Sequence, residues 1–303
     1  KSLQKKGFFD VGALFRFLKI VRSEKIDIIH AHSTSVFWAV LLKIFFPRVR
    51  IIWHDHFGNR PNDKRNNGFY RVISPLLSGV ITVSQDLYEW SIKNMMIPSS
   101  RIFFIRNFPD IKYIEGKAET DYVIIVCLAN LRPEKDHITL VKAIHLLTTE
   151  YENLKLKVIF AGRHYEDGYF YEILKLIEEL DLKDTIQIPG MIEEVSDLLA
   201  SADIGVLSSV FEGLPISLLE YGLAGLPVVV TDVGQCSEVL SNGALGRVAK
   251  AGDAQGIAKE LAWIINNRKL SMEMGIKFRD HVNKEYGSQN FISQYECLLN
   301  KIL

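Results

Sequence analysis

The sequence predicts an α/β protein made of two doubly wound domains, and three observations support this. Short runs rich in valine and isoleucine alternate with longer amphipathic runs, a pattern typical of parallel sheets covered by helices. The alternation is interrupted once, by the polar segment 109–121, which we interpret as a linker. The chain has 303 residues, of which 48% are hydrophobic and 24% charged, enough for two ordinary domains with buried cores.

In the first half, strand and helix patterns alternate. Short β-rich runs predict strands at 26–32, 49–54, 78–84 and 101–108. Apolar residues at helical spacing predict helices at 9–25, 35–46 and 85–96. We therefore expect a first domain over residues 1–113.

The second half repeats this alternation after the linker. Strands are expected at 122–130, 156–162, 185–190, 204–209 and 227–232. Helices are expected at 136–151, at 168–182, after Pro215, and in the stretches from residue 254 to the end. We expect a second domain over 114–282, and a C-terminal helix over 283–303 that packs back towards the first domain.

Positive charge is concentrated in the first half. Residues 1–113 contain 18 Lys and Arg against 8 Asp and Glu, so they carry +10 and the remainder carries −10. This asymmetry indicates either an anionic partner, such as a membrane surface, or a basic surface without a binding role. The longest apolar run, 36–46, is interrupted by Lys43 and is too short to span a bilayer.

The sequence lacks two kinds of motif, cysteine pairs at functional spacing and a dinucleotide-binding glycine motif, and this argues against several classes of protein. Cys127, Cys236 and Cys297 have no spacing typical of a zinc site or a disulfide framework, which favours a reducing cytoplasm. No G-x-G-x-x-G follows an expected strand, which argues against a dinucleotide-dependent dehydrogenase.

The segment 208–232 places two glutamates, Glu212 and Glu220, in a largely apolar stretch. Glu212 lies in the turn after an expected strand, and Pro215 suits the first position of the next helix. The amino end of a helix binds phosphate, and Gly213 allows close approach of the backbone. A carboxylate accepts hydrogen bonds from two hydroxyls. The segment therefore suits a nucleotide sugar, although Glu220 on a solvated helix face and Glu212 bonding turn amides are the alternatives.

The same segment resembles the signature of family 4 glycosyltransferases, in which two glutamates flank seven residues. Here the motif reads EGLPISLLE, preceded by SADIGVLSS and followed by GLPVVVTDVG and SEVL. The resemblance extends from about Asp27 to the C-terminus. It implies the GT-B fold, two Rossmann-like domains facing a central cleft. It also implies transfer of a sugar from a nucleotide sugar with retention of configuration and without a required metal.

The resemblance also implies roles for individual residues. It assigns Glu220 to the ribose, Glu212 to the donor sugar, and the backbone of Gly213, Leu214 and Pro215 to the phosphates. In FAGRHYEDG, Gly162 matches a glycine-rich turn of the family and joins the expected donor site.

A second motif, LANLRPEKDHITLVKAI, follows the first expected strand of the second domain. Cations at the end of a strand hold a diphosphate and neutralise a leaving group. Lys135 matches the family's lysine, but Ala129-Asn130 replaces its glycine-arginine pair. Arg132 is the nearest arginine, and two residues along an extended chain return a side chain to the same face, so we expect Arg132 to substitute. The alternative is that both are ordinary loop cations.

Four histidines end two neighbouring strands of the first domain: His30, His32, His54 and His56. Imidazoles bind zinc, but no Cys, Asp or Glu has convincing ligand spacing, and capping or packing explains the pattern equally well. We therefore expect no metal. The resemblance assigns His56, with His54 as the alternative, to contact with the donor sugar and acceptor, so the expected catalytic residues are His56, Glu212 and Lys135.

These inferences predict a retaining glycosyltransferase that moves a sugar from a UDP- or GDP-sugar to a glycan or lipid-linked acceptor in cell-surface polysaccharide biosynthesis. A nucleotide-sugar-binding but inactive fragment and a GT-B epimerase are the alternatives. We expect no cofactor and no nucleic acid partner, and a cytoplasmic protein that contacts the inner face of the membrane through its basic half. The family's first strand and glycine-rich loop are not found, so the first domain is expected to be incomplete.

Overall fold

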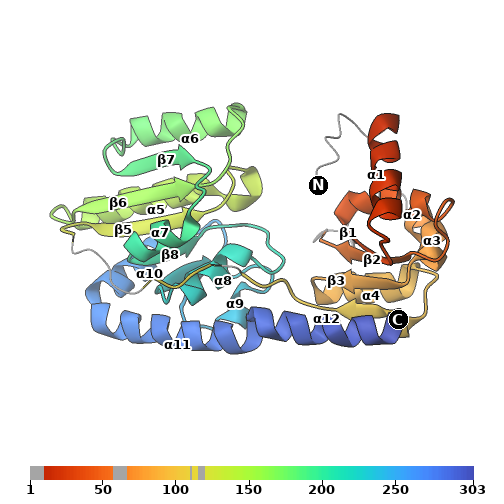
Figure 1. Cartoon of the computed structure of the whole chain (residues 1–303). Helices are drawn as coiled ribbons and strands as arrows, with labels where there is room; N and C mark the ends of the chain where they lie inside the picture. The colour runs from red at the N-terminus through yellow and green to blue at the C-terminus, as the bar shows by residue number, and fades with distance from the viewer. Residues whose placement is uncertain (1–9, 57–66, 110, 115–119) are drawn as a thin grey trace. The chain divides into compact units, whose positions relative to one another are not determined.

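The computed structural model describes residues 10–56, 67–109, 111–114 and 120–303, which form two compact units (Figure 1). Unit 1 comprises the described residues up to Arg106 together with Phe291–Leu303, and unit 2 comprises those of Asn107–Asn290. The end of the chain therefore belongs to the same unit as its beginning. No helix among the described residues is both long and apolar enough to cross a membrane.

Unit 1 is built on a parallel sheet whose described strands follow the chain order β1-β2-β3-β4. The strands are β1 (Ile28–His32), β2 (Arg50–Asp55), β3 (Gly79–Thr82) and β4 (Ile102–Phe104). The helices are α1 (Val11–Ser23), α2 (Val36–Leu42), α3 (Asn67–Ile73), α4 (Gln85–Asn94) and most of α12 (Ser288–Ile302). Successive side chains of β2 enter cores on opposite faces of the sheet, since Trp53 joins one core and Ile52 the other.

Helix α12 supplies the second of these cores. Leu298 is fully buried against Ile52, Ile81 and Ile105, which come from the sheet and the segment that follows β4. At the end of the helix, the Arg50 guanidinium donates to the carbonyl of Leu303 at 2.8 Å. The last residues of the chain therefore cover a sheet face formed by residues near its beginning.

Unit 2 contains a six-stranded parallel sheet in the order β10-β9-β8-β5-β6-β7. The strands are β5 (Val123–Leu128), β6 (Leu156–Ala161), β7 (Ile186–Gly190), β8 (Ile204–Leu207), β9 (Val228–Thr231) and β10 (Arg247–Ala249). The order reverses between β5 and β8, which makes this pair the topological switch point of a doubly wound sheet, where ligands bind beyond the strand ends.

Helices cover both faces of the second sheet. Helices α5 (His137–Glu150), α6 (Gly168–Glu179) and α10 (Ala254–Asn266) share one core with the sheet. The other face packs against α7 (Val195–Ser201), α8 (Ile216–Leu223), α9 (Cys236–Val239) and α11 (Arg268–Tyr286). Every residue of the central strands β8 and β9 is buried as a result, which explains why these strands read as continuous apolar runs.

Several element boundaries differ from the sequence expectation. The helix expected to begin at Pro215 begins at Ile216, because Pro215 is the N-cap and has an extended backbone (φ −74°, ψ 115°). The expected C-terminal helical stretch is divided at Asn267 and Gly287 into three helices. The elements α3, α9 and β10 were not predicted, since runs of three to seven residues are too short to show a period.

We predict that Leu298→Ala lowers the free energy of unfolding of unit 1 by about 2–4 kcal/mol, because it removes fully buried atoms from the core under α12. Urea unfolding followed by tryptophan fluorescence measures this, since three of the four tryptophans lie in unit 1. Leu303→Ala is the matched control because Leu303 is 65% exposed. Equal midpoints for the two variants would contradict the assigned role of α12.

Candidate active site

Tyr221 of α8 hydrogen-bonds the backbone at the switch point of unit 2, where β5 and β8 diverge. Strands β5 and β8 pair over only two residues each, and beyond them the backbone N–H of Leu128 donates to the Tyr221 hydroxyl at 2.6 Å. The hydroxyl in turn lies 3.2 Å from the carbonyl of Val126 and 3.3 Å from that of Val206. Gly205 makes room for the ring, since a Cβ there would lie 2.5 Å from Tyr221 Cγ. One buried side chain thus satisfies backbone groups of both diverging strands.

A pocket of about 450 Å³ lies beyond the carboxyl ends of these strands. This volume is in the range of small-ligand sites. Six residues expected from the sequence line it: Lys135, Gly162, Glu212, Leu214, Pro215 and Glu220. Arg132 and Gly213 are not among the lining residues, and His56 belongs to unit 1.

Lys135 and Glu212 form an ion pair in the pocket. Lys135 Nζ lies 2.6 Å from Glu212 Oε1, which also accepts from the Ser209 hydroxyl at 2.6 Å. The Glu212 side chain is 8% exposed and that of Lys135 is 23% exposed. Both interactions use Oε1, so Oε2 is the oxygen that can accept a ligand hydroxyl. The pair joins the two sequence motifs by a bond that the sequence did not predict.

Hydrogen bonds between loops fix this pair. Lys135 ends a short 3₁₀ turn, Pro133–Lys135, whose carbonyls accept from the loop after β8. The Glu134 carbonyl accepts from Val210 N, and the Lys135 carbonyl accepts from the Ser208 hydroxyl, both at 2.9 Å. These hydrogen bonds fix the two loops to each other, and so they keep Lys135 and Glu212 close together.

The loop after β9 supports Glu212 from another side. Gln235 N donates to the carbonyl of Gly213 at 3.0 Å. Gly234 has φ +53°, and a Cβ there would lie 2.3 Å from the Glu212 carbonyl. A glycine is required at 234 on both grounds. The backbone amide of Gln235 therefore holds the turn that carries Glu212.

Glu220 faces the pocket without a partner. It projects from α8, is partly buried, and no hydrogen bond or ion pair to its carboxylate is found in the part of the chain that the structure describes. Burial raises the pKa of Glu220. Pro215 is the N-cap of α8 and makes no side-chain hydrogen bond to the helix. The first backbone N–H groups of α8 are therefore available to an anionic ligand.

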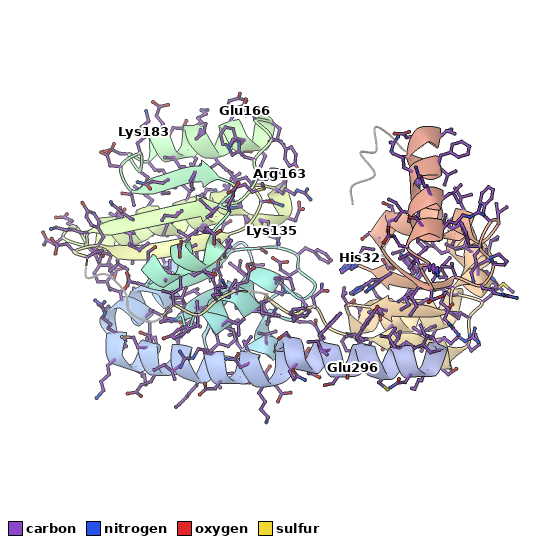
Figure 2. All side chains as sticks on the ribbon, viewed as in Figure 1. His32, Lys135, Arg163, Glu166, Lys183 and Glu296 are labelled. Atoms are coloured by element: carbon purple, nitrogen blue, oxygen red, sulfur yellow. The ribbon has the colours of Figure 1, made fainter. Side chains whose placement is uncertain are left out.

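The guanidinium of Arg132 contacts residues outside the lining of the pocket. Its guanidinium lies 3.5 Å from the Tyr165 hydroxyl and 3.8 Å from Glu134 Oε1, and its side chain is 48% exposed. Arg163, which the sequence reasoning did not select, follows β6, and its backbone N–H donates to Asn130 Oδ1 at 2.9 Å. Figure 2 labels both Lys135 and Arg163 in unit 2. The only sequence signal for Arg163 is its position after a strand end and a glycine.

Gly162 allows two loops to touch. A Cβ at this position would lie 2.1 Å from the carbonyl oxygen of Ala129, so any other residue would separate the loops after β5 and β6. Its own N–H donates to the carbonyl of Gly190 at 2.9 Å, which ties the end of β7 to the same edge. The expected donor-site glycine thus closes one wall of the pocket by close packing.

In unit 1 the four histidines gather at the ends of β1 and β2, where His32 pairs in register with His54. His32 Nδ1 and His56 Nε2 are 2.9 Å apart, and His54 stacks on His56 with ring centroids 4.0 Å apart. Burial, reinforced by the neighbouring imidazoles, lowers the pKa of His30 to about 4 and that of His54 to about 2, and it lowers the pKa of His56. These three rings are therefore neutral at physiological pH.

Two family models cover the chain. Residues 109–281 match "Glycosyl transferases group 1", and residues 2–113 match "Glycosyltransferase Family 4". Among curated proteins, the N-acetyl-alpha-D-glucosaminyl L-malate synthase of Bacillus anthracis is 25% identical over 97% of this chain and 80% of its own length. The poly(ribitol-phosphate) alpha-N-acetylglucosaminyltransferase of Staphylococcus aureus is 20% identical over 83% of this chain and 50% of its own length.

Solved structures show the same fold. Anabaena Alr3699/HepE, crystallised with UDP and glucose, superposes with a TM-score of 0.80 at 18% identity, over 97% of this chain and 84% of that one. The glycosyltransferase from Rickettsia africae gives a TM-score of 0.77 at 18% identity, over 100% and 83% of the two chains. The expected GT-B fold is confirmed by these neighbours and by the two parallel sheets.

We predict that Tyr221→Phe destabilises unit 2 by about 1–3 kcal/mol, because it leaves the buried N–H of Leu128 without an acceptor. Thermal unfolding monitored by near-ultraviolet circular dichroism measures the loss. Tyr171→Phe is the control, since Tyr171 is 56% exposed. A Tyr221→Phe variant as stable as this control would show that the hydroxyl does not support the diverging strands.

We predict that Glu220→Gln stabilises unit 2 at pH 7.5 but not at pH 4. The folded state raises the pKa of Glu220, so it favours the protonated form, and ionisation at higher pH costs stability. Glutamine mimics the protonated acid, and its advantage should therefore appear as pH rises through the raised pKa. Paired melting curves across this range test the sign, and a constant difference at all pH values would contradict it.

Proposed function

The chain belongs to the group 1 glycosyl transferases, and from that premise we propose that it is a retaining enzyme using a UDP- or GDP-sugar. The observation that carries the proposal is the pocket of unit 2, where an ion-paired Glu212 and an unpartnered Glu220 flank the amino end of α8. Two hydroxyl-binding groups on either side of an anion-binding helix end match the ribose, diphosphate and sugar of such a donor.

Each part of the donor has a corresponding group. We assign the ribose to the Glu220 carboxylate, whose burial makes hydrogen bonds from two ribose hydroxyls favourable. The diphosphate is assigned to the backbone of Gly213, Leu214 and Pro215 and to the first amides of α8. The transferred sugar is assigned to Glu212, through Oε2. Gly162 contributes by keeping the opposite wall closed.

Lys135 has a separate role in this proposal. Its ammonium is bonded to Glu212, and a diphosphate would offer it a second anionic partner. Contact with the diphosphate would neutralise the leaving group and release part of the Glu212 carboxylate for sugar hydroxyls. Arg132 would add a second cation once its guanidinium leaves Tyr165.

The proposed transfer proceeds on one face of the sugar. The bond between the anomeric carbon and the diphosphate oxygen breaks, and the electron pair leaves with the diphosphate, stabilised by Lys135 and the helix amides. The acceptor oxygen bonds to the same face, and its proton passes to the departing phosphate oxygen. Neither step needs a metal ion. His56, neutral at physiological pH, is assigned a hydrogen bond to the transferred sugar or to the acceptor hydroxyl.

We propose a glycan or lipid-linked acceptor in cell-surface polysaccharide biosynthesis. Two further relatives support this, one a capsular polysaccharide biosynthesis glycosyltransferase and one a galactosyltransferase acting on a diphosphoundecaprenol-linked sugar. Unit 1 exposes Ile44 and Phe45 between Lys43 and Arg48, a combination suited to the anionic inner face of a membrane. The enzyme would then act in the cytoplasm at that surface. Malate-like hydroxy acids belong in the acceptor screen, given the first relative above.

Calorimetric titration with UDP and with GDP, each with EDTA present, tests the proposal. We expect one nucleotide to bind without metal, and Glu220→Gln to weaken it by about tenfold or more, because a carboxylate that accepts two hydrogen bonds is lost. Glu212→Gln should reduce sugar transfer more than it reduces nucleotide binding. Glu179→Gln is the control, since Glu179 lies on the exposed face of α6.

Other outcomes would overturn specific parts. Absence of binding by either nucleotide would reject the donor site. Binding without transfer to any acceptor would favour an inactive binding protein, and conversion of the nucleotide sugar without an acceptor would favour an epimerase. Equal loss of binding and transfer in Glu212→Gln would reject its role at the sugar.

A further inference from the structure

Strands β1 and β2 end in the same pattern, His-x-His, and their parallel pairing brings the two patterns together. Ring nitrogens of His30, His32 and His54 all lie within 4.8 Å of one another. All three histidines lie within strands and not in a loop, so the paired backbone of β1 and β2 fixes the positions of their Cα atoms. Figure 2 labels His32 in unit 1.

The packing leaves polar atoms of this cluster unsatisfied. His54 is 2% exposed, and neither Nδ1 nor Nε2 has a hydrogen-bond partner among the described residues. Nε2 of His30 is buried and unpartnered in the same part of the structure. Each buried nitrogen without a partner costs stability, and stacking of the rings does not replace the missing bond. A packing role alone therefore does not account for the cluster.

The remaining nitrogens have outer partners. His30 Nδ1 lies 3.3 Å from the Tyr295 hydroxyl on α12, and His32 Nδ1 lies 2.9 Å from His56 Nε2. Histidines that bind a metal through one nitrogen normally hydrogen-bond through the other, which fixes the ring and its tautomer. In His30 and His32 this arrangement leaves Nε2 available in each ring.

We infer that His30, His32 and His54 bind one transition-metal ion, with zinc as the best match to three imidazole ligands. Zinc accepts three histidines and leaves a fourth position for water or another ligand. Tetrahedral Zn–N bonds place the nitrogens roughly 3.4 Å apart, so the rings must close in slightly, and exposed His32 has space for this small adjustment. The inference goes beyond the proposed function, whose donor site consists of unit 2 residues.

The sequence argued against metal because no cysteine or carboxylate has ligand spacing near these histidines. An open three-histidine site needs no fourth protein ligand, because water or another ligand takes that position. The sequence also allowed capping as the explanation, and the unpartnered nitrogens of His54 remove that explanation. A bound ion would further hold His32 Nδ1–H as a donor to His56 Nε2, which would fix the orientation of the proposed sugar or acceptor contact.

The metal-stripped protein should be titrated with Zn²⁺ by calorimetry and with Co²⁺ by visible absorption. We expect one ion per chain, a tetrahedral Co²⁺ spectrum, and a higher unfolding temperature of unit 1 with Zn²⁺. His32→Gln should weaken Zn²⁺ binding at least 100-fold, and this exposed position is safe for folding. Tyr295→Phe, which removes only an outer contact, should weaken it by about 10-fold. His145→Gln on α5 is the matched control.

The inference fails if wild type and His32→Gln bind Zn²⁺ with equal affinity, or if Zn²⁺ leaves the unfolding temperature unchanged. Loss of binding equally in His145→Gln would mean that isolated surface histidines are responsible. His54→Asn gives a second check, provided its circular dichroism spectrum matches wild type. Nucleotide binding by the same metal-stripped protein tests the donor site separately, so failure of one proposal is distinguishable from failure of the other.

Discussion

The pocket of unit 2 depends on the hydroxyl of Tyr221, which bonds the backbone where β5 and β8 part. Parallel strands that diverge lose their mutual hydrogen bonds, and buried backbone groups need other partners. The Tyr221 hydroxyl satisfies these backbone groups. Beyond them, the loop after β5 places Lys135 and the loop after β8 places Glu212 in the same pocket. The helix that carries Tyr221 also carries Glu220. Helix α8 therefore supplies both the hydroxyl that bonds the diverging strands and a carboxylate that lines the pocket.

The charged side chains of the pocket contribute little to the stability of unit 2. The ion pair of Lys135 with the nearly buried Glu212 stabilises the fold little more than an apolar pair would, because both charges lose solvation on burial. Glu220 is costlier, since burial raises its pKa and no described side chain offsets the cost. A nucleotide sugar would supply hydroxyls to both carboxylates and an anionic group to Lys135. Sites that carry such costs are characteristically functional.

Most of the fold was predictable from local pattern. The β–α alternation, the strand positions and the Glu212–Glu220 spacing all depend on residues near one another in the chain, where apolar period and turn chemistry act. The short elements α3, α9 and β10 were missed because runs of three to seven residues are too short to show a period. The start of α8 was misplaced by one residue, since Pro215 suits both the N-cap and the first helical turn.

The sequence by itself determined the fold class, the family and the residue types that the two motifs present. Tertiary structure alone decided their bonds: Lys135 to Glu212, Tyr221 to Leu128, Gly162 against Ala129, and Arg132 directed to Tyr165. It also decided that the nitrogens of His54 have no partner among the described residues. The physical reason is that hydrogen bonds and burial depend on distances between residues far apart in sequence, which chain pattern does not specify.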